Sequence, residues 1–195
     1  MKNFTPPVNF SGNLPVVRKL LAAACFLAMT QAGATGFITD AKQISEQEVR
    51  SGEGYYRADG NWLVYQAEMA GKNPFYQIYL KNLKTGQIKQ ISPGDGKTTC
   101  SWVHPSQEKV LFSSTHEDPE AKAKMAAEIE QRQSGQRRAY AWDYDEFYDI
   151  YEADFNGENI KNLTNIKGYD AEASWSPDGK LIAFASNRRA YSEPL

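Results

Sequence analysis

A turn and the apolar run that follows it, near the end of the chain, constrain the fold more than any other feature. Residues 176–179 read Ser-Pro-Asp-Gly. Proline presets φ at the second position of a turn, aspartate bonds to the nearby backbone, and glycine supplies a positive φ. Residues 181–185 are all apolar, which predicts a strand covered on both faces.

The same turn and strand recur upstream. Residues 105–112 match residues 177–184, and a tryptophan-containing stretch precedes both, at 100–102 and 173–175. A looser copy at 58–65 keeps the Asp-Gly turn and the terminal aromatic residue without the proline. Because this order of turn and strand repeats, the turn belongs to one unit of a repeating β architecture.

A second module lies between these turns. Residues 75–79, Phe-Tyr-Gln-Ile-Tyr, return at 147–151 as Phe-Tyr-Asp-Ile-Tyr, and each copy leads through a polar turn into a short strand. Two hairpins make a four-stranded antiparallel sheet of roughly 40 to 50 residues, the size of one propeller blade. A β-sandwich also uses short hairpins with Asp-Gly turns. Two modules that recur in the same order favour the propeller.

The repeated residues resemble a known family. The string Ser-Pro-Asp-Gly-Lys-Leu-Ile-Ala-Phe at 176–184, and Tyr-Asp-Ile-Tyr at 148–151 with Asn-Leu-Thr at 162–164, are similar to the WD40-like PD40 repeat. This repeat builds the β-propeller of TolB-like periplasmic proteins, and related blades form the N-terminal propellers of prolyl-oligopeptidase-type enzymes. The resemblance covers about residues 51–195 and implies an all-β fold, with six blades in a complete TolB-like protein.

The resemblance also implies a function. A TolB-like propeller acts without catalysis as a protein-interaction module of the cell envelope, where its partner is a peptidoglycan-associated lipoprotein. Such proteins carry a small α/β domain before the propeller, whereas only about 16 residues separate Ala34 from the first blade here. The alternative is the N-terminal, substrate-gating propeller of a larger exopeptidase whose catalytic domain lies beyond residue 195. A third reading is a stand-alone sugar- or peptide-binding propeller.

The beginning of the chain reads as an export signal. Arg18 and Lys19 precede an apolar run at 20–29 that is too short to span a bilayer, and small residues stand before Ala34. Cleavage after Ala34 predicts a periplasmic or otherwise secreted protein with no stable membrane insertion. Cys25 offers a weaker alternative, a lipid anchor. Once the leader is removed, Cys100 is the remaining cysteine, expected to be a small buried residue without a disulfide.

The predicted organisation follows from these signals. It comprises a signal peptide at 1–34, an N-terminal segment at 35–50, and an incomplete propeller at 51–195, with blade 1 at about 51–95, blade 2 at about 96–166 and a partial blade 3 at about 167–195. Because Asp59 and Tyr76 are 17 residues apart, the same spacing from Asp178 ends at residue 195. We therefore expect the chain to be an N-terminal fragment of a longer propeller.

Blade 2 carries an insertion at about 115–146, roughly 25 residues longer than its counterpart in blade 1. Asp118, Pro119 and an acidic residue mark a helix start, and Ser134 with Gly135 marks its end. Charge pairs at i,i+4 join Glu120 to Lys124 and Glu128 to Arg132. The narrow apolar stripe predicts a helix that lies on a surface.

The end of the insertion is rich in charged and aromatic residues. Inserted loops gather binding residues, and Tyr, Trp and Arg are favoured at interface hot spots. The candidate protein interface is therefore Arg138, Tyr140, Trp142 and Tyr144. Alternatively, these aromatic side chains pack the helix against the blade. Asp143, Asp145 and Glu146 have the oxygen ligands that calcium prefers, but they lack the spacing of an EF-hand loop.

Catalytic and cofactor motifs are absent from the sequence. His104 and His116 lack metal-ligand spacing, and His104 aligns with Ser176, which predicts an exposed turn residue. There is no nucleophile elbow, phosphate-binding loop or HExxH helix. The net charge of −2, or −5 after loss of three basic leader residues, leaves no basic patch for nucleic acid. We expect no enzymatic activity, cofactor or metal. The expected partner is a protein, either an envelope protein or the missing blades or domain of the same protein.

Overall fold

The computed structural model describes residues 40–45, 47–136 and 144–188. The chain divides into two units, Met1–Ile44 and Ser45–Leu195, and every described strand and helix belongs to the second. Residues 40–44 of the first unit contain neither helix nor strand. Within the described ranges, no helix has the length and apolar character needed to cross a membrane.

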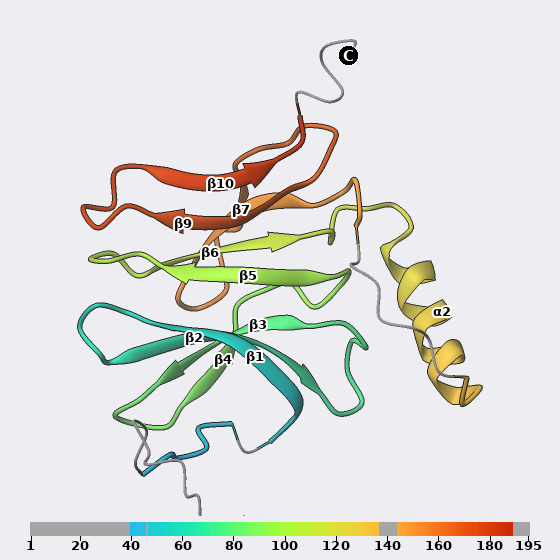
Figure 1. Ribbon diagram of the computed structural model, residues 1–195, viewed down its shortest axis with the longest axis horizontal. Helices are drawn as coiled ribbons and strands as arrows, with labels where there is room; N and C mark the ends of the chain where they lie inside the picture. Colours follow the sequence, from blue (N-terminus) through green and yellow to red (C-terminus); the bar gives the residue numbers. More distant parts are fainter. Residues whose placement is uncertain (1–39, 46, 137–143, 189–195) are drawn as a thin grey trace, which may run out of the picture. The chain divides into compact units, whose positions relative to one another are not determined.

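Three antiparallel sheets follow one another along the second unit (Figure 1). The first has the order β1-β2-β3-β4, the second β5-β6-β7-β8, and the third pairs β9 with β10. In chain order the strands are β1 (Glu48–Tyr56), β2 (Trp62–Met69), β3 (Gln77–Asn82), β4 (Ile88–Gln90), β5 (Thr98–Val103), β6 (Lys109–Ser114), β7 (Asp149–Asp154), β8 (Lys161–Asn162), β9 (Asp170–Trp175) and β10 (Ile182–Ser186). Helix α2 (Ala121–Gln133) stands between β6 and β7. The prediction of propeller blades with one helical insertion in the second blade is confirmed.

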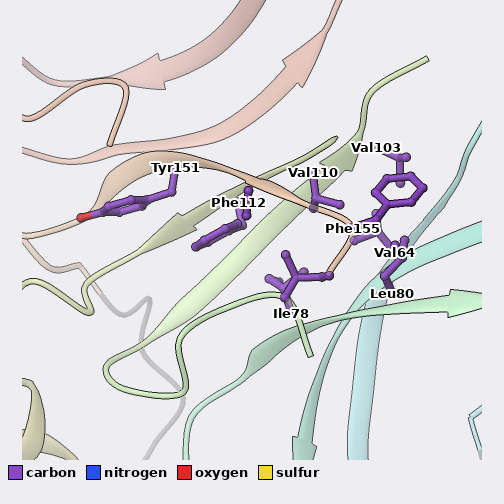
Figure 2. Close-up of a cluster of buried hydrophobic side chains, with 10 residues drawn as sticks. Val64, Ile78, Leu80, Val103, Val110, Phe112, Tyr151 and Phe155 are labelled. Carbon is purple, nitrogen blue, oxygen red and sulfur yellow. The ribbon is translucent and has the colours of Figure 1, made fainter. Parts of the chain in front are cut away.

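The core lies between the first two blades. Alternate residues of β2, β3, β6 and β7 meet there with Val103 of β5 and Phe155 from the turn after β7. Figure 2 labels eight of these core residues: Val64, Ile78, Leu80, Val103, Val110, Phe112, Tyr151 and Phe155. Phe155, from the turn after β7, packs on Trp62 of blade 1 with ring centroids 4.9 Å apart. In the same turn, a Cβ on Gly157 would lie 2.9 Å from the carbonyl oxygen of Gln90. Side chains and turn backbone of blade 2 therefore both pack against blade 1.

A smaller cluster joins blade 2 to the third sheet. It contains Leu111, Ile150, Ala173 and Trp175. His104, predicted to be exposed, is instead 4% exposed, because the Trp175 ring packs edge-on against its imidazole at 4.8 Å. Its turn position is as predicted, since His104 Nδ1 accepts hydrogen bonds from two backbone N–H groups of the turn, at 2.9 and 3.1 Å.

The residues that recur in the second module make the same pair of hydrogen bonds in both blades. In blade 1 the Ile78 N–H donates to Ser92 Oγ at 3.0 Å, and that hydroxyl donates to Gln77 Oε1 at 2.7 Å. In blade 2 the N–H of the matching isoleucine donates to Thr164 Oγ1 at 3.0 Å, and Thr164 donates to Asp149 Oδ1 at 2.5 Å. The hydroxyl thus ties the short outer strand to the start of the strand beside it.

Each inner strand contains a bulge at the same repeat position. Glu53, Cys100 and Glu172 have φ values of 44°, 50° and 59°, and the pairing register shifts beside each of them. Counted from the matching turns at Pro105 and Pro177, Trp175 corresponds to Val103 and Trp102 to Ser174, so the two tryptophans are not equivalent. A slip of one residue moves a side chain to the opposite face of a strand.

Strand β10 departs from the expectation of cover on both faces. Leu181, immediately before it, is 71% exposed, and Phe184 is 41% exposed. Only one neighbouring strand, β9, pairs with β10 in the described part of the chain. The apolar composition of this segment therefore exceeds what the described contacts bury.

Candidate functional site

The insertion of blade 2 forms helix α2 and the turns on either side of it. Its N-cap position is Glu120, two residues later than predicted, because the Asp118 side chain accepts the Glu120 N–H at 2.8 Å in a turn that precedes the helix. The helix ends at Ser134 as predicted, and Gly135 follows with φ 70°. The apolar stripe lies partly outward, since Ile129 is 41% exposed.

An ion cluster attaches the first half of the helix to blade 2. Lys124, predicted to pair with Glu120, places Nζ 2.7 Å from Asp118 and 2.8 Å from Asp145, and Lys97 lies 3.4 Å from Asp145. Both aspartates are buried. Burial alone would raise the pKa of Asp145, but hydrogen bonds from Lys124 and a backbone N–H outweigh it and lower the pKa. Asp145 therefore stays charged and holds the helix.

A second cluster attaches the end of the helix to blade 1. Arg132 Nη1 lies 2.7 Å from Glu68, and Arg132 Nη2 donates to the Pro74 carbonyl at 2.6 Å. Glu68 also binds Arg50 of β1 at 2.7 Å, and Arg132 keeps its predicted pair with Glu128 at 2.8 Å. Figure 1 shows α2 beside one end of the sheets. The helix thus bridges two blades.

The predicted interface residues fall in different parts of this region. Arg138, Tyr140 and Trp142 lie outside the described residues. Tyr144 is 42% exposed, and its hydroxyl accepts a hydrogen bond from Asn187 at 3.1 Å. Its ring lies 6.0 Å from that of Tyr169. The end of the insertion therefore contacts the third sheet.

A cavity that was not predicted from the sequence opens between the start of β7 and the turn after β8. It has a volume of about 310 Å³ and is lined by Glu146, Phe147, Asp149, Asn165, Ile166 and Lys167. Phe147 and Ile166 are 42% and 44% exposed. A sequence signal did exist, because Ile166 stands in the polar turn Asn-Ile-Lys-Gly, where an apolar residue has no strand to pack against.

The candidate calcium ligands are not arranged around an ion. Asp143 lies outside the described residues, Asp145 is bound by Lys124, and Glu146 pairs with Lys167 at 3.2 Å. Among the residues that the structure describes, no three His, Cys, Asp or Glu side chains are placed to hold a metal.

One serine–histidine pair occurs at the end of β6. His116 Nδ1 lies 3.0 Å from Ser114 Oγ, and the same hydroxyl lies 3.2 Å from Thr98 Oγ1. Ser114 is fully buried. Burial lowers the pKa of His116. A nucleophile must reach a substrate, and the Ser114 hydroxyl is enclosed, so we assign it to the packing of the blade.

The sheet order and the internal repeat define the class of this chain, a partial β-propeller. No family model matches it. Its fold is similar to a putative TolB from Agrobacterium tumefaciens, with 18% identity, a TM-score of 0.47, and 73% of this chain and 45% of that chain covered. TolB from Acinetobacter baumannii is 23% identical, with a TM-score of 0.48, and the match covers 73% of this chain and 28% of that chain. The GH74 enzyme of Niastella koreensis is 13% identical, with a TM-score of 0.35, and the match covers 57% of this chain and 14% of that chain. The chain spans less than half the length of the TolB structures that it matches.

Proposed function

We propose that this chain is an exported, non-catalytic protein-interaction module of the cell envelope, built from TolB-like PD40 blades. The export signal at 1–34 and the PD40 motifs support this proposal. Cleavage of this leader would release the mature protein into the periplasm or outside the cell. The repeat supplies a rigid scaffold on which inserted loops bind partners.

The observation that carries the proposal is the exposed apolar surface around the anchored insertion. Tyr144, Phe147 and Ile166 are each more than 40% exposed, although ion pairs attach the helix before them to two blades. Exposed aromatic side chains on a fixed frame are favoured at protein interfaces, because their binding costs little conformational entropy. The partner we propose is another envelope protein.

Site-specific photo-crosslinking tests this function in the cell that carries the gene. A photoreactive phenylalanine at Tyr144 should form a crosslinked product with an envelope protein. The matched control places the same group at Lys84, an exposed residue in the turn after β3. Equal products from both positions, or none from Tyr144, would contradict the proposal. Cell fractionation and N-terminal sequencing of the mature chain test export, with Thr35 expected as the first residue.

A further inference from the structure

The cavity next to the insertion combines an apolar wall, an ion pair between Glu146 and Lys167 at 3.2 Å, and a further carboxylate, Asp149. Phe147 and Ile166 form the wall, and Asp149 also lines the cavity. Asp149 accepts hydrogen bonds from Thr164 Oγ1 at 2.5 Å, from Asn162 Nδ2 at 3.0 Å and from the Ile166 N–H at 3.4 Å. All of these donors are neutral, so none of them cancels the charge of the carboxylate.

Comparison of the two blades shows that the fold does not require this charge. The residue of blade 1 that matches Asp149 is Gln77, and it accepts a hydrogen bond from Ser92 at 2.7 Å, as Asp149 does from Thr164. A neutral amide oxygen therefore performs the structural task. The carboxylate of blade 2 adds a negative charge that blade 1 omits.

A second carboxylate lies close to the first. Glu117 Oε2 accepts hydrogen bonds from Tyr151 and from Asn162, each at 3.0 Å. The same Asn162 nitrogen donates to Asp149, so the two carboxylate oxygens lie within about 6 Å of each other. Hydrogen bonds from Asn162 lower the pKa of Glu117. Within the described residues, neither acid has a basic side chain at ion-pair distance.

We propose that this cavity binds a segment of the partner protein that presents an arginine or lysine beside an aliphatic or aromatic side chain. The cationic group would lie against Asp149 and Glu117, and the apolar side chain would lie on Phe147 and Ile166. This inference rests on the proposed function and specifies the chemistry of its partner. Charge complementarity of this kind sets specificity and association rate.

The chemistry of the site favours a basic side chain over a bare metal ion. Long basic side chains lay an apolar stem along an apolar wall and keep the charged end at a carboxylate. A hard cation requires about six oxygen ligands, whereas the Asp149 and Glu117 oxygens already accept hydrogen bonds from side chains. An acidic segment would meet the like charge of Asp149 in the cavity and that of Glu117 close to it.

Binding of a synthetic peptide to the full chain tests this inference. The probe is fluorescein-labelled Gly-Leu-Arg-Phe-Gly, and the matched control peptide carries citrulline, a neutral isostere, in place of arginine. Fluorescence anisotropy in 50 mM NaCl should give at least fivefold tighter binding of the arginine peptide. The preference should shrink in 500 mM NaCl, because salt screens exposed charge pairs.

Three variants assign the effect to the cavity. Asp149→Gln, which installs the blade 1 solution, Glu117→Gln, which keeps an acceptor, and Ile166→Ser should each weaken the arginine peptide about three- to tenfold, as expected for the loss of about one charge or apolar contact. Glu130→Gln, on the exposed face of α2, should leave binding unchanged. If a carboxylate variant fails to fold, Ile166→Ser still decides, because its side chain is exposed.

The outcomes separate this inference from the proposed function. Equal binding of the two peptides, or binding indifferent to Ile166→Ser, overturns the inference. Displacement of the peptide by millimolar calcium, with calcium binding independent of Ile166, overturns it in favour of a cation site. A crosslink at Tyr144 without peptide preference removes only the cavity chemistry. Peptide preference without any crosslinked envelope protein removes the proposed function and keeps the cavity.

Discussion

Neutralising Glu68 should release the inserted helix from blade 1. The Glu68 side chain is 9% exposed and lies 2.7 Å from both Arg50 and Arg132. The substitution Glu68→Gln keeps the shape of the side chain and removes the charge that both guanidinium groups contact. Because Arg132 belongs to α2 and Glu68 to β2, the loss falls on the junction between the blades.

The expected magnitude follows from the exposure of the partners. Breaking a fully buried ion pair costs about 3–5 kcal/mol, whereas an exposed pair contributes about 0–1 kcal/mol. The side chains of Arg50 and Arg132 are 47% and 36% exposed, so water replaces part of what they lose. We expect Glu68→Gln to lower the free energy of unfolding by about 2 kcal/mol, between those limits.

The matched control removes the other partner of the same arginine. Glu128→Gln breaks the pair between Glu128 and Arg132 within the helix, which should cost about 0.3–0.5 kcal/mol. Urea denaturation of the 195-residue chain, followed by tryptophan fluorescence, measures both losses, with the denaturant slope expected to stay constant. A double-mutant cycle of Glu68→Gln with Arg132→Gln should give a coupling of about 1 kcal/mol.

Two results would refute this reasoning. One is a loss from Glu68→Gln no larger than that from Glu128→Gln. The other is a coupling below about 0.3 kcal/mol, which is the usual limit of additivity between independent sites. Either result would mean that the helix is not held on blade 1 by this carboxylate, and that Arg132 acts only within α2.

Three other perturbations test separate parts of the molecule. Gly157→Ala should cost about 3 kcal/mol or more in chemical denaturation and Gly86→Ala only about 1–2 kcal/mol, because both have positive φ but only a Cβ on Gly157 would strike the Gln90 carbonyl; equal losses would contradict close blade packing. Burial raises the pKa of the Cys100 thiol to about 11. In a variant with Cys25 replaced by serine, Cys100 should therefore react with an aromatic disulfide reagent at pH 8 about 10- to 30-fold more slowly than a thiol of ordinary pKa. A rate equal to that of free thiols would argue against burial. Burial also lowers the pKa of His116. The stability that its neutral ring contributes is therefore complete above pH about 6.5 and is lost as the pH falls. From pH 6.5 to 5 the melting temperature of His116→Gln should decline less steeply than that of the unsubstituted chain, and an equal decline would oppose this assignment.

The blade architecture could be predicted because its repeated residues have local tasks. The Asp-Gly turn bonds to its own backbone, as when Asp178 accepts the Lys180 N–H at 3.1 Å. The hydroxyls of Ser92 and Thr164 bind the N–H of a strand only 14 residues earlier in the chain. Such local contacts require particular residue types at a fixed spacing, so they can be recognised in the sequence.

The bulges have no comparable signal in the sequence. The residues with positive φ in the inner strands are Glu53, Cys100 and Glu172, and none is the glycine that usually marks this conformation. The register shift beside each of them follows from strand pairing, which the local pattern does not contain.

The site was predictable in its elements and not in its contacts. A helix with a surface stripe was expected, but Arg132 reaches a glutamate 64 residues away. His104 is buried by Trp175 from another sheet, although its own turn resembles an exposed one. Ile166 gave a weak signal, and its cavity depends on Phe147 from the preceding hairpin. Tertiary packing decides each of these cases.

The insertion replaces a polar contact that blade 1 makes by itself. Asn73 and Asp145 occupy the same repeat position, and each accepts the backbone N–H two residues ahead, at 2.8 and 3.2 Å. The Asn73 amide also donates to two backbone carbonyls, at 2.9 and 2.7 Å, which an aspartate has no hydrogen to do. Blade 2 compensates with Lys97 and, from the inserted helix, Lys124. The helix therefore completes the polar network of its blade, so changes at Lys124 should cost stability, whereas changes at exposed Tyr144 should alter binding first.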